Sequence, residues 1–223
     1  MSQSISNKAP RSQKVSLAGP AGRLEAIVET PADDTAVGAV VVCHPHPQHG
    51  GTMHNKVAHT LARAFVRMGF AALRFNFRGT GTSDGEFDEG VGEVEDAKAA
   101  LAWMRAEYVD GPLWLGGFSF GAAIAVKVAI ESPPDGLITV APAAHQFAQG
   151  FGGQPECRWL IVQGDQDELV DIADTIEWVN RLRPGPELLV MTGAEHFFHG
   201  RLVELRDAVT DFVQKKAGAN PGF

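Results

Sequence analysis

Apolar residues occupy consecutive positions in the middle of the chain, in runs such as AVVVC and WLIV. Consecutive apolar positions indicate strands that are buried on both faces, as in a parallel sheet covered by helices. Strands are predicted at residues 15–17, 24–29, 39–43, 71–76, 113–115, 136–140, 159–162 and 188–191. Amphipathic stretches predict helices at residues 54–68, 91–107, 120–131, 172–182 and 201–215.

The order of these elements predicts an α/β protein with a doubly wound, mostly parallel sheet of eight strands. No helix separates the first two strands, so they are expected to form an antiparallel hairpin at one edge of the sheet. We expect a single domain over residues 15–216. It lies between a flexible N-terminal tail at 1–14 and a C-terminal tail at 217–223.

Composition limits the classes of function. The 223 residues are 44% hydrophobic and 21% charged, which suits one globular domain. The formal net charge of −8 argues against a nucleic-acid partner, because an acidic surface repels phosphates. Cys43 and Cys157 lack the spacing of metal ligands and are interpreted as reduced thiols of a cytoplasmic protein. No secretory signal and no apolar run of the ~18 residues that span a bilayer is present, so no membrane association is expected.

A serine between glycines follows the strand predicted at 113–115. Gly117, Ser119 and Gly121 form the pattern G-x-S-x-G, and a helix is predicted to begin at Phe120. In this strand–turn–helix context the serine lies on a sharp turn, and a side chain at either glycine would collide with a neighbouring element. The dipole of the helix also favours negative charge on the reacting oxygen. Ser119 is therefore the candidate nucleophile, and the alternative is a tight glycine turn with an incidental serine.

A serine hydroxyl is a weak nucleophile, so it needs a base, and the base needs a carboxylate that orients it. Two later strands are followed by suitable residues, Asp165 and Asp167 after LIVQ, and His196 and His199 after LLVM. Both turns fall past the carboxyl ends of strands, where ligands bind in open parallel sheets. Asp165 can alternatively be a loop carboxylate that binds backbone N–H groups, and His199 a residue in the first turn of a helix.

With these residues the chain resembles the α/β-hydrolase superfamily over nearly its whole length, roughly residues 15–215. In that superfamily the order along the chain is serine, acid, histidine. The acid commonly lies in G-x-x-D-x-x-V, which residues 164–170 match with Asp167 as the acid. The resemblance therefore implies a catalytic triad of Ser119, Asp167 and His196, with Asp165 as the competing acid.

The loop after the strand at 39–43 has the sequence HPHPQHGG. In α/β-hydrolases this loop supplies one backbone N–H to the developing oxyanion, and the residue after the nucleophile supplies the other. The resemblance implies Phe120 as the second donor. Pro45 and Pro47 have no N–H and are excluded as the first donor. His46 stands where the donor falls in the common H-G-x form of this loop, so the resemblance implies His46.

Histidines at positions 44, 46 and 49 also invite comparison with the zinc loops of metallo-β-lactamase-type proteins. Gln48 stands at the aspartate position of such a loop, and prolines fill the gaps. The downstream aspartate and histidine already have a complete explanation in the triad. Neither a metal nor a cofactor is therefore expected.

Three segments carry a more specific resemblance, to small bacterial hydrolases related to dienelactone hydrolases. They are HPHPQHGGTMHNKV, NFRGTGTS and GAEHFF. The dienelactone members use cysteine as nucleophile, whereas this chain has Ser119, which argues against a dienelactone substrate. The NFRGTGTS turn is interpreted as structural, with glycines for the bend and a hydroxyl for the backbone.

About fifteen residues, from Ala143 to Arg158, separate the sixth predicted strand from the seventh, too few for a lid domain. Phe118, Phe147 and Phe197 are candidates to line the resulting open site. An apolar rim with one oxyanion hole favours a small ester as substrate, with a thioester as the alternative. A haloperoxidase-like activity would use the same triad. A non-catalytic small-ligand binding protein is the rival from another class, and the complete Ser-Asp-His set argues against it.

Overall fold

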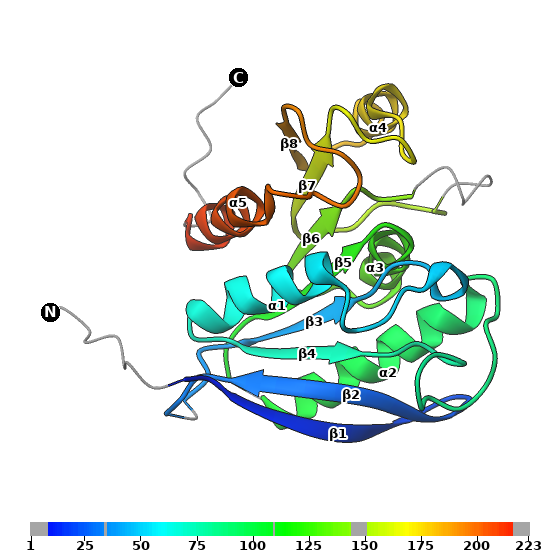
Figure 1. Ribbon diagram of the computed structural model, residues 1–223, viewed down its shortest axis with the longest axis vertical. Coiled ribbons are helices and arrows are strands. Elements are labelled where there is room, and N and C mark those ends of the chain that lie inside the picture. The colour runs from blue at the N-terminus through cyan, green and yellow to red at the C-terminus, as the bar shows by residue number, and fades with distance from the viewer. Residues whose placement is uncertain (1–8, 34, 109, 144–150, 216–223) are drawn as a thin grey trace, which may run out of the picture.

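One sheet forms the centre of the protein. The computed structural model describes residues 9–33, 35–108, 110–143 and 151–215. Within them, eight strands form a sheet in the spatial order β1-β2-β4-β3-β5-β6-β7-β8 (Figure 1). The strands are β1 (Arg11–Gly19), β2 (Gly22–Thr30), β3 (Ala39–Cys43), β4 (Ala71–Phe75), β5 (Leu113–Phe118), β6 (Gly136–Val140), β7 (Arg158–Gly164) and β8 (Glu187–Met191). From β4 to β8 all neighbouring pairs are parallel, whereas β1 with β2 and β2 with β4 are antiparallel.

Helices cover both faces of this sheet (Figure 1). They are α1 (Lys56–Arg67), α2 (Val91–Glu107), α3 (Phe120–Glu131), α4 (Ile172–Val179) and α5 (Leu202–Gln214), with a short 3₁₀ helix at Pro47–His49. The core on one face is built with residues of α1 and α5, and the core on the other face with residues of α2 and α3. On the second face, Trp178 of α4 packs against Trp159 of β7 with ring centroids 5.5 Å apart.

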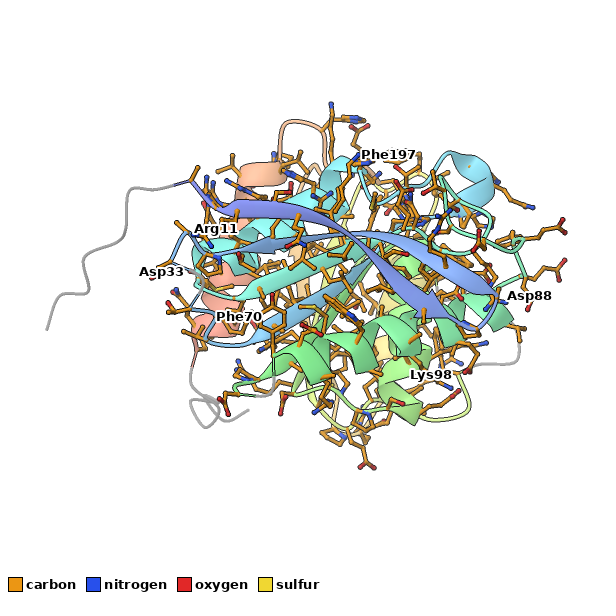
Figure 2. All side chains as sticks on the ribbon, turned by 90° about the horizontal axis from the view of Figure 1, so that it is seen from below. Arg11, Asp33, Phe70, Asp88, Lys98 and Phe197 are labelled. Carbon is orange, nitrogen blue, oxygen red and sulfur yellow. The ribbon has the colours of Figure 1, made fainter. Side chains whose placement is uncertain are left out.

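The apolar runs of the sequence are the central strands of the sheet. Every residue of β3, β5 and β6 is buried, as the consecutive apolar positions predict. Figure 2 shows side chains filling the space on both sides of the sheet, with Lys98 on the side of α2 and Phe197 on the opposite side. The predicted mostly parallel sheet with an antiparallel N-terminal edge is confirmed.

The boundaries of several elements differ from the prediction by one to four residues, among them those of β1 and α4. Strand β1 begins at Arg11 and pairs with β2 from Arg11 opposite Thr30, so residues 11–14 belong to the sheet and not to the predicted tail. These residues are exposed and carry no apolar pattern, and backbone pairing with β2 places them in the edge strand. Helix α4 ends at Val179, three residues before the predicted end. The predicted C-terminal tail, 217–223, lies outside the described residues.

Buried polar contacts fix the loops that follow β3 and β4. Asn76 accepts a hydrogen bond from the Met53 amide (2.8 Å) and donates one to Glu25 (2.7 Å). The hydroxyl of Ser83 donates to the Asn76 carbonyl (2.8 Å) and accepts from the Glu25 amide (2.9 Å). The NFRGTGTS turn thus ties β2 to the loop after β3, in agreement with its structural interpretation.

Seventeen residues, 141–157, connect β6 to β7, and 144–150 of them lie outside the described residues. Among the described residues, no helix combines the length and the apolar character that a membrane span requires.

Candidate active site

Ser119 occupies a one-residue turn between β5, which ends at Phe118, and α3, which begins at Phe120. Its backbone has φ 56° and ψ −118°, a conformation that side-chain-bearing residues rarely adopt. The Ser119 amide donates to the carbonyl of Val140 at the end of β6 (2.9 Å), and its carbonyl accepts from Ala122 (3.0 Å) in the first turn of α3. The turn is therefore held from both sides, and it presents the serine at the carboxyl edge of the sheet.

The glycines beside Ser119 permit close backbone contacts. A Cβ atom at Gly117 would lie 2.3 Å from the carbonyl oxygen of Gly121, and one at Gly121 would lie 2.3 Å from that of His44. Strand β5, helix α3 and the end of β3 thus touch through their backbones. The predicted reason for both glycines, that a side chain would collide with a neighbouring element, is confirmed.

His196 lies between Ser119 and Asp167. Its Nε2 atom is 3.1 Å from Ser119 Oγ, and its Nδ1 atom is 2.9 and 3.0 Å from the two carboxylate oxygens of Asp167. The imidazole is almost completely buried. A carboxylate can only accept at Nδ1, so the neutral ring carries its proton there and Nε2 is left to accept the serine hydroxyl. This geometry fits a base that is oriented by an acid.

The Asp167 carboxylate is held by its own loop. Oδ1 accepts hydrogen bonds from the amides of Leu169 (2.9 Å) and Val170 (2.8 Å). Burial raises the pKa of Asp167, but the hydrogen bonds from His196, Val170 and Leu169 lower it, and the resulting pKa lies below the ordinary value. The carboxylate is therefore charged at neutral pH and favours a proton on Nδ1 of the imidazole.

The competing candidates have other contacts. Asp165 accepts a hydrogen bond from the Gly193 amide (2.6 Å), which matches its interpretation as a loop carboxylate. Among the described residues, Asp165 makes no hydrogen bond to the His196 ring. His199 is exposed and pairs with Glu195. The structure therefore brings together Ser119, Asp167 and His196, and it leaves Asp165 and His199 outside the group.

The loop after β3 begins with His44, which is fully buried. Burial lowers the pKa of His44 to about 4, so the ring is neutral. Its Nε2 atom accepts from the Phe77 amide (3.1 Å), which leaves the proton on Nδ1, 2.6 Å from the Pro45 carbonyl. A Cβ atom at Gly51 would lie 2.1 Å from the Pro45 oxygen, so the loop is closed tightly on itself.

His46 and Phe120, the predicted oxyanion donors, lie side by side, with ring centroids 4.9 Å apart. Within the part of the chain that the structure describes, neither backbone N–H has a hydrogen-bond acceptor. Two unpaired N–H groups on neighbouring segments, next to the serine, are what an oxyanion hole requires.

Comparisons with known proteins identify the family of the chain. The family model described as serine aminopeptidase, S33, matches residues 35–155, just over half of the chain. An α/β serine hydrolase without a lid from Xanthomonas campestris is 42% identical, with a TM-score of 0.86 over 94% of this chain and 97% of that one. A serine hydrolase homologue from Coxiella burnetii is 44% identical, with a TM-score of 0.84 over 94% and 99%. An uncharacterised protein from Rickettsia prowazekii is 36% identical over 205 residues, 87% of this chain and 86% of that protein.

The chain belongs to the α/β-hydrolase superfamily. Its sheet order and its similarity to a lid-less serine hydrolase confirm the predicted fold class. The members of the group around Ser119 come from three separate loops of this α/β-hydrolase, each at the carboxyl end of a strand. This is the edge at which open parallel sheets bind ligands.

The predicted substrate-lining phenylalanines have different places. Phe118 has no exposed surface and packs against the His196 ring (5.0 Å between centroids), so it supports the imidazole and offers no accessible surface of its own. Phe197 is 40% exposed beside the same ring, with centroids 5.1 Å apart, and lies at the surface in Figure 2. Phe147 falls outside the described residues.

The histidines of the loop after β3 do not converge on a common point. Both ring nitrogens of His44 are within hydrogen-bond distance of backbone groups, and His46 stacks on His49 with centroids 4.4 Å apart. Among the described residues, no group of three or more His, Cys, Asp or Glu side chains could hold a metal ion.

Two residues that contact the site were not predicted from the sequence. Gln163 donates to Oδ2 of Asp167 (2.9 Å), and Glu168 accepts from the backbone amide of His196 (3.2 Å). The available signal for Gln163 is a polar residue directly after the apolar run WLIV, because a buried polar side chain there requires a partner. Glu168 had no comparable signal among the four polar residues of DQDE.

The backbone contact at Gly117 leads to a stability prediction. Gly117→Ala is expected to lower the free energy of unfolding by about 1–3 kcal/mol, because the new methyl group overlaps the Gly121 carbonyl. Gly116→Ala is the matched control, since its Cβ atom would have no neighbour nearer than 3.6 Å. Urea unfolding of both variants measures the difference, and equal stabilities would contradict the close packing at the turn.

Proposed function

We propose that this α/β-hydrolase is a serine esterase, which cleaves small carboxylic esters through an acyl-enzyme on Ser119. The observation that carries the proposal is the alignment of Ser119 Oγ, the His196 ring and the Asp167 carboxylate at hydrogen-bond distances. A hydroxyl in contact with an imidazole that a carboxylate orients is the arrangement that nucleophilic acyl transfer needs.

In the first half of the reaction, His196 Nε2 takes the proton from Ser119 as Oγ attacks the ester carbonyl. Asp167 stabilises the imidazolium that forms. The tetrahedral intermediate then collapses, and His196 gives the proton to the departing alkoxide, so that the alcohol leaves and the acyl group stays on Ser119. In the second half, water repeats the sequence and releases the acid.

The negative charge of each tetrahedral intermediate develops on the former carbonyl oxygen. The N–H groups of His46 and Phe120 are the proposed donors to this oxygen, and the N-terminus of α3 adds its positive dipole end. The close backbone contacts at Gly51 and Gly121 hold the segments that carry these N–H groups. The N–H groups therefore do not need to reorganise as the charge forms.

The short connection between β6 and β7, residues 141–157, supports a small substrate. An open site buries little of a long acyl chain, and the exposed ring of Phe197 offers an apolar surface for a short one. A thioester would use the same groups, and comparison of matched ester and thioester substrates separates the two.

The first test concerns the nucleophile. We expect the wild-type protein to react with a fluorescent fluorophosphonate and to hydrolyse p-nitrophenyl acetate and butyrate faster than palmitate. Ser119→Ala should lose the labelling and about 10⁴-fold or more of the turnover, because no other nucleophile takes the place of Oγ. Circular dichroism establishes that the variant is folded. Turnover by Ser119→Ala at the wild-type rate would overturn the proposal.

The second test separates the two aspartates. Asp167→Asn should lower kcat by about 10⁴-fold, because an amide donates to Nδ1 and favours the wrong tautomer of His196. Asp165→Asn keeps an oxygen for the Gly193 amide, so the same rate measurement should show a small change only. A larger loss for Asp165→Asn than for Asp167→Asn would assign the acid to Asp165.

A further inference from the structure

Gln163 is a buried polar residue in a strand that is otherwise apolar from Trp159 to Val162. Its side chain has no exposed surface. Burial of an amide is unfavourable unless both of its ends find hydrogen-bond partners. The position therefore calls for an explanation beyond packing.

The surroundings of Gln163 fix the orientation of its amide. The Nε2 atom lies 2.9 Å from Asp167 Oδ2, 3.2 Å from the Val170 carbonyl and 3.4 Å from the Gly164 carbonyl. Three acceptor oxygens surround this end, so only the NH₂ group fits there. The carbonyl end faces the Thr175 hydroxyl of α4 at 3.5 Å.

The two oxygens of the Asp167 carboxylate share the His196 Nδ1–H, at 3.0 Å from Oδ1 and 2.9 Å from Oδ2, but otherwise have different donors. Oδ1 accepts from two amides of its own loop, those of Leu169 and Val170. Oδ2 accepts from Gln163 as well as from His196. Among the described residues, no other group donates to Oδ2. Gln163 is thus the contact that holds this oxygen in place when the His196 ring moves or changes its charge.

We propose that Gln163 is a positioning residue, which holds the Asp167 carboxylate in the plane of the His196 ring and disperses part of its negative charge. The inference rests on the proposed function, since it concerns the acid of that triad. Without the Gln163 N–H, the carboxylate can rotate away from Nδ1. Its charge is also less neutralised, so it attracts the proton of the imidazolium more strongly.

Three other carboxylates in the loops around Asp167 and His196 accept hydrogen bonds from backbone amides. Asp165 accepts from Gly193, Glu168 from His196, and Asp171 from Ala173 at the start of α4. Glu195 pairs with the exposed His199. Within the described residues, the side chains that contact the Asp167 carboxylate are therefore those of His196 and Gln163.

The test replaces Gln163 by methionine, which has similar length and no donor. In Gln163→Met we expect kcat for p-nitrophenyl acetate to fall by about ten- to a hundredfold with little change in KM, because the base is misaligned. We also expect the acid limb of the kcat/KM profile to move to higher pH, because the base holds its proton more strongly. If Gln163 had a purely structural role, its replacement would not shift the acid limb of the kcat/KM profile.

Two further variants keep the test decisive. Thr175→Val removes the hydroxyl at the other end of the Gln163 amide, and we expect it to leave the pH profile in place. Gln163→Glu preserves length and can donate to Oδ2 only while its carboxyl group is protonated. The ratio of its activity to that of Gln163→Met should therefore be highest at low pH and should fall as the pH rises.

The outcomes distinguish this inference from the proposed function. A folded Gln163→Met with wild-type kcat and pH profile overturns the role of Gln163, and so does an equal shift in Thr175→Val. Either result leaves the triad intact if Ser119→Ala and Asp167→Asn are inactive. Full activity of Ser119→Ala would instead remove the proposed function itself. If Gln163→Met does not fold, the activity of Gln163→Glu is compared with that of the wild type at each pH. A ratio that does not change with pH overturns the positioning role of Gln163.

Discussion

The backbone of Ser119 depends on the contact between β3, β5 and the first turn of α3. A residue with φ 56° and ψ −118° costs about 1–3 kcal/mol of strain, which the surrounding packing must offset. The packing is close because Gly117 and Gly121 place backbone against backbone, and a methyl group at either would overlap a carbonyl oxygen. The same contact brings Phe120 beside His46, so the proposed nucleophile and the proposed oxyanion donors share one support.

The loops of the proposed acid and base, Asp167 and His196, are joined by hydrogen bonds into a second unit. Asp165 and Glu168 accept from the amides of Gly193 and His196, and the Gln166 amide donates to the Ala194 carbonyl (3.0 Å). Both loops leave neighbouring parallel strands, β7 and β8, so their carboxyl ends meet at one edge of the sheet. The two units meet at the contact between His196 and Ser119, and small shifts there would misalign the proton transfer.

Local patterns allowed much of this to be predicted. The apolar runs identified the central strands, and G-x-S-x-G identified the turn at Ser119, because both depend on neighbours in the sequence. Strand β1 begins at Arg11 because of pairing with β2, which no apolar pattern records. The different contacts of Asp165 and Asp167, the burial of Phe118 and the role proposed for Gln163 depend on residues from distant strands. Only the folded arrangement of β7, β8 and β5 could separate them.

The central claim is that Ser119 itself carries the acyl group. The direct measurement is mass spectrometry of the protein after brief mixing with p-nitrophenyl acetate and quenching in acid, followed by digestion with trypsin. Ser119 is the only serine of the tryptic peptide 106–127, so its adduct is unambiguous. We expect one acetyl group on Ser119 of this peptide and none on the same peptide of Ser119→Ala. Continued turnover with the acetyl group on another residue, or on none, would contradict it.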